Sequence, residues 1–276
     1  MTKRAPTASR RASRADRGPA VHPTAIVDSN AELAEAVRVG PYAVIGPEVT
    51  IGPRTSVGAH CVLEGCTTIG ADCQIFTGAV VGSIPQDLKY TGEKSQLVIG
   101  DRNRIREYVT INRGTKGGGG TTRIGSDCLL MAYSHVAHDC QIGHRVILAN
   151  SAELAGHIEI EDEAIIGGLV GIHQFVRVGR LSIIGGCSRV AQDVPPFSTC
   201  VGYPSKVYGL NHEGLTRAGV SKAVKVSLHQ AFRVLFHSGL SMSHAMEKVS
   251  RDVNHGPEVA HLLEFIRASK RGVCRA

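Results

Sequence analysis

The sequence has no tryptophan, and aromatic residues make up only 4% of its 276 positions. A conventional sandwich or α/β core uses more large side chains, so something else must fill this interior. No stretch reaches 18 apolar residues, which excludes a membrane-spanning helix. The eight cysteines form no C-x-x-C pair and show no disulfide-framework spacing. Glycine, in contrast, is abundant, with 32 residues.

The formal net charge of +7 is concentrated at the N-terminus. Residues 1–20 contain six Lys or Arg and one Asp, a net charge of +5, which leaves +2 for the rest of the chain. This segment is rich in Ser, Ala and Arg and has no apolar h-region, so it is not a secretory signal. We expect a disordered basic extension over residues 1–20, or a start codon placed too early. Binding to nucleic acid or to membranes by this segment is the less favoured alternative.

Aliphatic residues recur at a strict step of six along most of the chain. The step is unbroken for eleven hexads from Val21 to Val81, for three from Ile99 to Ile111, and for twelve from Ile124 to Val190. The fifth residue of most hexads is small, and half of the cysteines occupy this position, as expected of core residues in a reducing cytoplasm. Glycine often follows the aliphatic residue, where it would allow a bend.

A period of six fits neither a helix nor the alternation of an ordinary strand. It is typical of a parallel β-helix, in which each hexad forms one short strand and three hexads form a triangular coil of 18 residues. The aliphatic and the small residue of each hexad point inward, and a narrow prism of this kind has no room for aromatic side chains. The sequence therefore predicts a β-helix over residues 21–196, with loop insertions at 83–98 and 117–123. The second insertion is rich in glycine but lacks the Gly-Lys-Ser/Thr of a phosphate-binding loop.

Helical periodicity begins where the hexads stop, and we expect a C-terminal helical domain over residues 197–276. One apolar stripe runs from Val224 to Leu235, with Ser221 as its N-cap and Gly239 beyond its end. A second helix is indicated between Ala245 and Val253, and a third begins at Pro257 and ends at Gly272. This domain could cover the last coil of the prism.

Outward-facing histidines gather in the second half of the repeat: His135, His138, His144, His157 and His173. The hexads that begin at Val136, Leu154 and Ile172 are 18 residues apart, so they stack on one face of the prism. We therefore expect His138, His157 and His173 in successive coils of that face, with His135 across the preceding corner.

Such a cluster suits general-base catalysis, because imidazole titrates near neutral pH. Asp139 directly follows His138 and could orient its ring. A zinc site is less favoured, because the His-x4-His pair of the γ-class carbonic anhydrases, which share this fold, is missing. A flat face becomes a cleft only if another prism packs alongside it, so the sequence implies an oligomer.

Several longer motifs go beyond the hexad: QDLKY (86–90), IGDRNRIRE (99–107), HVAHDC (135–140), LAGH (154–157), HQF (173–175), GGCSRVAQDVPP (185–196) and NHEGL (211–215). In this order they resemble the bacterial UDP-N-acetylglucosamine O-acyltransferase family, from about His22 to the C-terminus. The resemblance implies a left-handed, all-β parallel β-helix with a small C-terminal α-helical domain, assembled as a cytoplasmic homotrimer.

The activity implied by the resemblance is the first step of lipid A biosynthesis. A (3R)-3-hydroxyacyl chain moves from acyl carrier protein to the 3-hydroxyl of UDP-N-acetylglucosamine, with no metal and no organic cofactor. The resemblance also implies roles for three residues at the reacting centre: His138 is the general base, Asp139 supports it, and the Gly156 backbone N–H binds the developing oxyanion.

The resemblance further implies a set of substrate-binding residues: Gln86, Asp87, Lys89, His135, His157, His173, Gln174, Asn211, Glu213 and Arg217. Family members often have two consecutive arginines where this sequence has Arg217 followed by Ala218, so one phosphate contact is expected to be missing. Asn211 could instead be a turn residue, and Asp87 and Lys89 could be solvated loop charges. Gly186 matches the position that limits the acyl chain, and a glycine there implies a donor of about C14.

Two related activities compete with this interpretation. The N-acyltransferase that acts later in the same pathway shares the prism and the acyl carrier protein donor, but it usually has an N-terminal uridine-binding domain. The hexads begin here by Val21, which leaves no room for that domain. Acetyl-CoA-dependent transferases of the same fold, and a structural solenoid without enzymatic activity, are further alternatives. A solenoid would not need four outward histidines on one face.

Overall fold

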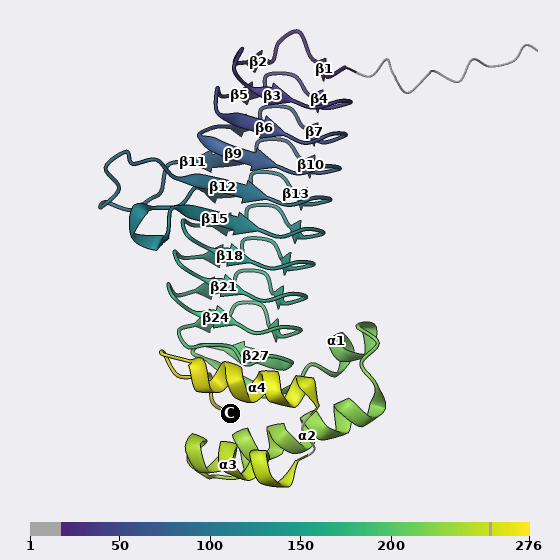
Figure 1. Ribbon diagram of the computed structural model, residues 1–276, viewed down its shortest axis with the longest axis vertical. Coiled ribbons are helices and arrows are strands. Elements are labelled where there is room, and N and C mark those ends of the chain that lie inside the picture. The colour runs from purple at the N-terminus through teal and green to yellow at the C-terminus, as the bar shows by residue number, and fades with distance from the viewer. Residues whose placement is uncertain (1–17, 254–255) are drawn as a thin grey trace, which may run out of the picture.

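The computed structural model describes residues 18–253 and 256–276. Most of the chain forms a tall stack of triangular coils, each made of three short strands joined by bends, and the helices lie together at the C-terminal end (Figure 1). Of the predicted basic extension, residues 1–17 lie outside the described residues, and the first strand begins at Ala20. Within the described ranges, no helix is both long and apolar enough to span a bilayer.

The three sides of the stack are three sheets, and the first of them has eleven strands. Its pairings are parallel except for the last one, which is an antiparallel hairpin. In spatial order the strands are β1 (Ala20–Val21), β4 (Arg38–Val39), β7 (Ser56–Val57), β10 (Gln74–Ile75), β13 (Arg104–Ile105), β16 (Leu129–Leu130), β19 (Ile147–Leu148), β22 (Ile165–Ile166), β25 (Ile183–Ile184), β27 (Ser198–Gly202) and β28 (Ser205–Leu210).

The second and third sheets are parallel throughout and have nine and eight strands. The second sheet consists of β2 (Ile26–Val27), β5 (Val44–Ile45), β8 (Val62–Leu63), β11 (Val80–Ser83), β14 (Thr110–Asn112), β17 (His135–Val136), β20 (Glu153–Leu154), β23 (Gly171–Ile172) and β26 (Arg189–Val190). The third sheet consists of β3 (Glu32–Leu33), β6 (Val49–Ile51), β9 (Cys66–Ile69), β12 (Gln96–Ile99), β15 (Thr121–Ile124), β18 (Gln141–Ile142), β21 (Glu159–Ile160) and β24 (Arg177–Val178).

The register keeps the sequence period in space. Val21 pairs with Val39, one coil of 18 residues further along the chain, and the same step relates Leu130 to Leu148. Inward positions are filled as predicted: the aliphatic Leu63 and the small Ala43 and Cys61 have no exposed surface. All eight cysteines are free thiols, as the absence of a framework spacing predicted.

The glycine that follows many strands serves a purpose different from the one expected. The residues with positive φ are mostly the fourth of each hexad, for example Tyr42 and His60, and few of them are glycine. A Cβ built on Gly52 would lie 2.6 Å from the backbone carbon of Gly70 in the next coil. Glycine at this position is therefore required by the close approach of stacked coils and not by the bend itself.

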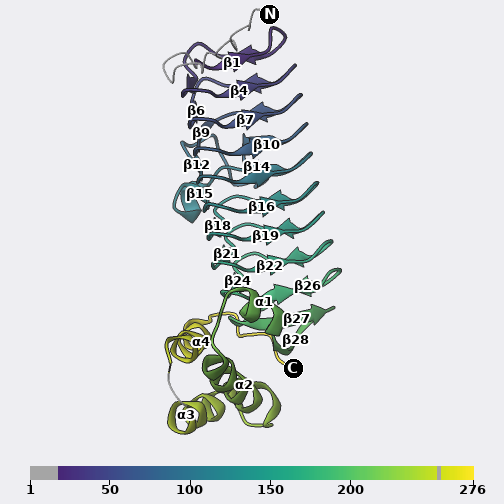
Figure 2. The same cartoon turned by 90° about the vertical axis from the view of Figure 1, so that its right-hand side faces the viewer.

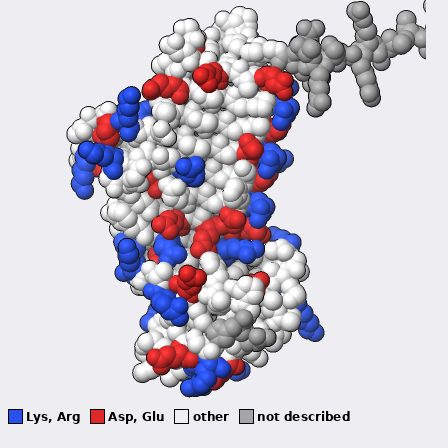
Figure 3. All heavy atoms as spheres, viewed as in Figure 1, with Lys and Arg blue, Asp and Glu red and all other residues white. Residues whose placement is uncertain are grey.

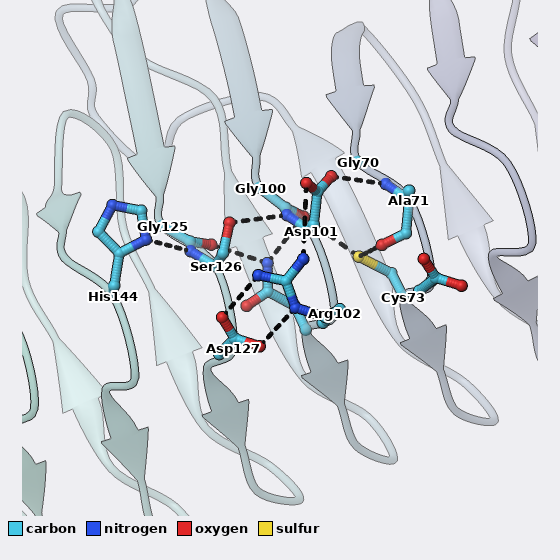
Figure 4. Close-up of polar contacts among 12 residues, drawn as sticks. Gly70, Ala71, Cys73, Gly100, Asp101, Arg102, Gly125, Ser126, Asp127 and His144 are labelled. Atoms are coloured by element: carbon cyan, nitrogen blue, oxygen red, sulfur yellow. Dashed lines mark hydrogen bonds and ion pairs between the residues drawn. The ribbon is translucent and has the colours of Figure 1, made fainter.

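Polar side chains link successive coils from inside and outside. Inside, Asn103 occupies a fully buried fifth position, donates to the Gly100 and Gly125 carbonyls at 2.9 and 2.8 Å, and accepts the Cys128 N–H at 2.8 Å. Outside, Asp101 accepts the backbone N–H of Ala71 from the coil before it at 2.8 Å (Figure 4). These bonds use N–H and C=O groups at the bends, which the short strands leave unpaired.

The corner that follows the third sheet carries a column of opposite charges. Arg54 pairs with Asp72 at 2.6 Å, Arg102 with Asp127 at 2.7 Å, and Arg145 with Glu163 at 2.8 Å. Figure 3 shows acidic and basic side chains alternating along this edge of the prism. Each pair is exposed and contributes little alone, but the column keeps like charges from stacking directly upon one another.

Both predicted insertions lie outside the coils, on the same side of the prism (Figure 1). Residues 84–95 connect β11 to β12 without regular structure. The second excursion is shorter at its C-terminal end than predicted, because Thr121–Ile124 is strand β15; it contains the short helix η1 (Lys116–Gly118). Thr121, Thr122 and Arg123 pair with β12, which favours the sheet over a loop.

The C-terminal region begins with the β27–β28 hairpin, which extends the first sheet, so the prism continues beyond residue 196. The helices follow: α1 (His212–Arg217), α2 (Lys222–His237), α3 (Met242–Asp252) and α4 (Pro257–Ala268). Ser221 caps α2 as predicted, whereas the last helix ends at Ala268 and not at Gly272. Figure 2 shows α4 beside the last coil, where His261 bonds Glu161 at 2.8 Å.

We predict that Asn103→Ala destabilises the prism strongly. The change leaves two buried carbonyls and one buried N–H without partners, at a cost of about 2–4 kcal/mol. In a protein of this size the midpoint of thermal unfolding should fall by about 5–15 °C. Asn150→Ala is the control, because Asn150 is exposed. Equal melting of the two variants would show that the buried bonds contribute nothing.

Candidate active site

The corner that follows the second sheet carries the histidines identified in the sequence. His138, His157 and His173 follow β17, β20 and β23, and these three strands are consecutive neighbours in that sheet. His135 lies in β17 itself and points away from the core, next to Glu153 of β20 in the register. The predicted convergence of these imidazoles on one face is therefore present in the structure.

His138 and Asp139 form a hydrogen-bonded pair at the centre of this corner. The Nδ1 atom of His138 lies 2.8 Å from Oδ2 of Asp139, whose side chain is only 1% exposed. A carboxylate oxygen only accepts hydrogen bonds, so Nδ1 carries the proton and Nε2 is left free as a base. The Asp139 backbone N–H is bound by the hydroxyl of Thr122 at 2.8 Å, and its φ is +60°.

His157 packs directly against this pair. Its ring meets that of His138 edge to face, with the centroids 5.0 Å apart, and stacks on Phe175 at 4.4 Å. Its Nδ1 lies 3.7 Å from Oδ2 of Asp139. Burial lowers the pKa of His157, despite the opposing effect of the Asp139 charge.

His135 and His173 flank the pair on either side. Nδ1 of His135 lies 2.7 Å from the Thr110 hydroxyl, and burial, with the charge of His138 as a smaller cause, lowers the pKa of His135. His173 is exposed, and its Nδ1 lies 3.3 Å from the guanidinium of Arg271 near the C-terminus. Lowered pKa values keep His135 and His157 neutral at pH 7, so the centre of the site contains hydrogen-bonding imidazoles without added positive charge.

Gly156 lies against the His138 ring, and the contact requires a glycine. A Cβ built at this position would be 2.6 Å from Cε1 and 2.8 Å from Nε2 of His138, closer than any side chain can sit. Among the described residues, the Gly156 N–H has no hydrogen-bond acceptor. A free backbone donor beside a free imidazole nitrogen is the arrangement expected of an oxyanion site next to a general base.

A cavity of about 760 Å³ opens over these residues. His138, Gly156 and His157 form part of its floor, His173 and Gln174 lie at one end, and Gln86, Asp87 and Lys89 reach it from the 84–95 loop. The structure thus brings together all the predicted site residues of the prism and first loop except Asp139, which lies beneath His138, and Gly186.

Four predicted residues lie outside this cavity. Gly186 is exposed at the corner that follows the first sheet, on a different edge of the prism. Glu213 and Arg217 are exposed in α1. Asn211 is buried and caps that helix: its Oδ1 accepts the Gly214 N–H at 2.9 Å, and its Nδ2 donates to the Leu181 carbonyl at 2.9 Å. Both polar groups of its side chain are therefore engaged within the chain, as the alternative of a structural turn residue implied.

Sequence reasoning missed three residues that line the cavity: Glu153, Phe175 and Arg189. Burial raises the pKa of Glu153, which stands between His135 and the open space over Gly171. The 18-residue step from His135 predicts the positions of Glu153 and Arg189, since both lie on the same row of the second sheet. The HQF motif contained Phe175, but nothing indicated that it would stack on His157.

Three side chains at the site could offer ligands to a metal ion. One ligand atom each from His138, Asp139 and His157 lies within 4.8 Å of the others. Nδ1 of His138 and Oδ2 of Asp139 already bond to each other, and a metal would have to replace that bond. The donor set as it stands fits a hydrogen-bonded catalytic pair better than a coordination sphere.

Models of known families match two parts of the chain. "Bacterial transferase hexapeptide (six repeats)" matches residues 30–65 and 121–156, which lie in the prism. "Udp N-acetylglucosamine O-acyltransferase; Domain 2" matches residues 193–274, the hairpin and the helices. Both halves of the architecture thus correspond to segments known from acyltransferases.

Curated relatives extend this similarity over nearly the whole chain. Proteins from Verminephrobacter eiseniae and Thermodesulfovibrio yellowstonii are 51% and 49% identical to it, over 92% of this chain and 99% of each relative. Both are named acyl-[acyl-carrier-protein]–UDP-N-acetylglucosamine O-acyltransferase.

Solved structures agree with the sequence relatives. The UDP-N-acetylglucosamine acyltransferase of Bacteroides fragilis has a TM-score of 0.89 at 41% identity, covering 92% of this chain and 99% of that one. The enzyme from Campylobacter jejuni has a TM-score of 0.88 at 38% identity, with coverages of 93% and 99%. A coil of opposite hand would not superpose this well, so the predicted left-handed parallel β-helix with a small helical C-terminal region is confirmed.

We predict that the neutral imidazole of His135 makes stability depend on pH. Its pKa is lowered in the folded protein, so as the pH falls below about 6.5 the unfolded chain takes up a proton that the folded chain does not. Stability is therefore lost as the pH falls through this range, and His135→Gln should make the decline between pH 7 and pH 5 shallower. Unfolding measured across that range, with the exposed His60→Gln as control, tests this. An unchanged slope in His135→Gln would contradict the prediction.

Proposed function

The chain belongs to the UDP-N-acetylglucosamine O-acyltransferase family, and from that premise we propose how its own residues carry out the family reaction. It transfers an acyl chain from acyl carrier protein to UDP-N-acetylglucosamine, the first step of lipid A biosynthesis. The observation that carries the proposal is the buried Asp139 carboxylate, which holds Nδ1 of His138 and leaves Nε2 toward the cavity.

His138 acts as the general base. Its Nε2 takes the proton from the sugar 3-hydroxyl while that oxygen attacks the thioester carbonyl of the donor. The tetrahedral intermediate collapses with loss of the carrier's thiolate, to which the protonated imidazole returns the proton. Asp139 stabilises the imidazolium that forms between the two proton transfers. No covalent link to the protein and no cofactor is needed in this sequence of steps.

Gly156 stabilises the intermediate. Its N–H, which has no acceptor among the described residues, donates to the oxygen of the tetrahedral adduct. Such a donor is effective because it is already oriented and need not be withdrawn from another partner. The absence of a Cβ also lets the reacting carbonyl approach Nε2 of His138.

The remaining cavity residues bind the two substrates. Gln86, Asp87 and Lys89 on the first loop bind the sugar and the 3-hydroxyl region of the acyl chain, assisted by His135, His157, His173 and Gln174. Glu213 and Arg217 of α1 contact the nucleotide. Arg217 is a cation suited to the diphosphate, whereas the neighbouring Ala218 adds none.

The active unit is a homotrimer with sites between neighbouring subunits. The cavity over His138 is open, while Gly186 and the nucleotide-contacting helix α1 do not line it within one chain. The corner that carries Gly186 also exposes large apolar side chains, among them Tyr108, Tyr133 and Leu169. A neighbouring prism that buries this corner would complete the groove. We place the enzyme in the cytoplasm, which suits its free thiols and a donor carried by acyl carrier protein.

We predict that His138→Ala lowers kcat by about 10²–10⁴-fold while the fold persists. The matched control is His144→Ala, which removes another outward histidine from the same hexad position on the third sheet. Transfer to UDP-N-acetylglucosamine is measured with 3-hydroxyacyl, unsubstituted acyl and acetyl donors. Near-normal turnover in His138→Ala would exclude this base, and preference for the acetyl donor would favour an acetyl-CoA-type transferase.

We predict that Gly186 sets the length of the acyl chain. It is exposed, and a Cβ there would meet only the Gly168 carbonyl oxygen at 3.2 Å and its nitrogen at 3.9 Å, so a larger side chain fits with a small adjustment. The wild type should prefer a 3-hydroxyacyl donor of about C14, and Gly186→Met should shift the optimum several carbons shorter. Each methylene group buried contributes roughly 0.8 kcal/mol, so a few carbons separate donors clearly.

A series of donors from C8 to C16 measures this shift. Thr77→Met is the control, since Thr77 occupies the same hexad position on the first sheet five coils away. Because Gly186 does not line the His138 cavity of its own chain, a shifted optimum would also support a groove shared by two subunits. A wild-type preference for C10, or an unmoved optimum in Gly186→Met, would refute the assignment.

A further inference from the structure

The second excursion from the prism lies over the catalytic pair. Residues 113–120 leave the second sheet after β14 and enter the third sheet at β15. Thr115, the N-cap residue of η1, is only 6% exposed, although the excursion around it lies on the surface. None of the family motifs that identified the site includes this residue, and it does not line the cavity.

Thr115 binds both oxygens of the Asp139 carboxylate. Its backbone N–H donates to Oδ1 at 2.8 Å, and its hydroxyl donates to Oδ2 at 2.6 Å. Oδ2 is also the acceptor for Nδ1 of His138, at 2.8 Å. The two bonds from Thr115 fix the rotation of the carboxylate, and through it the plane of the catalytic imidazole.

The excursion is shaped to approach this carboxylate closely. A Cβ built on Gly118 would overlap the carboxylate of Asp139, and one built on Gly114 would lie 2.8 Å from Oδ1. Two glycines on either side of Thr115 thus allow the backbone to lie against the acid. This explains the glycine-rich composition of a segment that has no phosphate-binding pattern.

The excursion is itself anchored at several points. Gly114 donates to the Gln96 carbonyl at 3.1 Å, and Gly120 closes the turn onto the Thr115 carbonyl at 2.8 Å. The Lys116 N–H donates to Glu93 at 3.2 Å, and Glu93 lies on the loop that carries Asp87 and Lys89. Backbone N–H groups, first that of Thr91 and then those of Glu93 itself and Lys116, lower the pKa of Glu93 to about 2. The anchor therefore stays charged over the working range of the enzyme.

We propose that Thr115 is a positioning residue for the reaction, acting through Asp139 on the general base His138. It touches neither substrate nor the reacting atoms, and it sets the angle from which the imidazole meets the sugar hydroxyl. The inference rests on the proposed role of His138. Without the Thr115 hydroxyl, Oδ2 loses the donor opposite His138, and the carboxylate can rotate within its pocket.

The test compares Thr115→Val, which removes the hydroxyl at nearly constant volume, with Thr115→Ser, which keeps it. Thr115→Val should lower kcat by about 10- to 100-fold, the loss expected when a catalytic group is displaced by about 1 Å. KM for both substrates should change little, because Thr115 does not line the cavity. Thr115→Ser should restore most of the loss, and Thr121→Val, in the adjoining strand β15, should leave kcat at the wild-type value.

A double-mutant cycle separates positioning from a general loss of stability. In an Asp139→Ala background there is no carboxylate to orient, so Thr115→Val should have little further effect on kcat. Wild-type kcat in Thr115→Val, equal losses in both backgrounds, or no restoration by Ser would overturn the proposal. If Thr115→Val does not fold, Thr115→Ala is judged by the same three outcomes. His138→Ala keeps the two hypotheses apart: activity there refutes the base, whereas its inactivity beside a fully active Thr115→Val refutes only the role of Thr115.

Discussion

The stacking of coils at a fixed 18-residue step is the constraint on which the rest of the structure depends. Each hexad must turn an aliphatic and a small residue inward, so chemistry can be placed only at outward and corner positions. Residues 18 apart then lie on neighbouring rungs, where their side chains meet. The site uses this directly: Asp139, His157 and Phe175 occupy the same turn position in three successive coils, and each packs on the next. A repetitive core thereby produces a specific local cluster without long-range folding of the chain.

Periodicity explains what could be predicted. The face shared by His138, His157 and His173 follows from counting, and the adjacency of His138 and Asp139 suggested their bond before any geometry was known. The same counting could have revealed the column of alternating charges that includes Arg102 and Asp127, because charge alternates there from coil to coil. What lies on one rung is thus recoverable from the sequence wherever the step of six is unbroken.

Insertions end that advantage, because they break the phase. Thr115 lies 24 residues before Asp139, a separation that corresponds to no simple number of coils, yet its hydroxyl reaches the carboxylate. Likewise, the anchor from Glu93 to Lys116 joins two excursions whose paths the repeat does not determine. Asn211 shows the limit of a motif: its place in a family pattern suggested nucleotide contact, while its side chain caps α1 and bonds to the Leu181 carbonyl. Motifs indicate which residues matter, and only the geometry shows through which atoms they act.

The arrangement also explains how one acid can serve a base in the middle of several imidazoles. If His135 and His157 were protonated, their charges would oppose protonation of His138 as it takes the proton from the sugar. Burial lowers the pKa of both flanking rings, so they remain neutral hydrogen-bonding groups. The carboxylate of Asp139 then directs its hydrogen bond at His138 alone, at 2.8 Å, while His157 stays 3.7 Å away. The difference between these two distances, set by the threonine and glycines that hold the acid, selects a single base from the cluster.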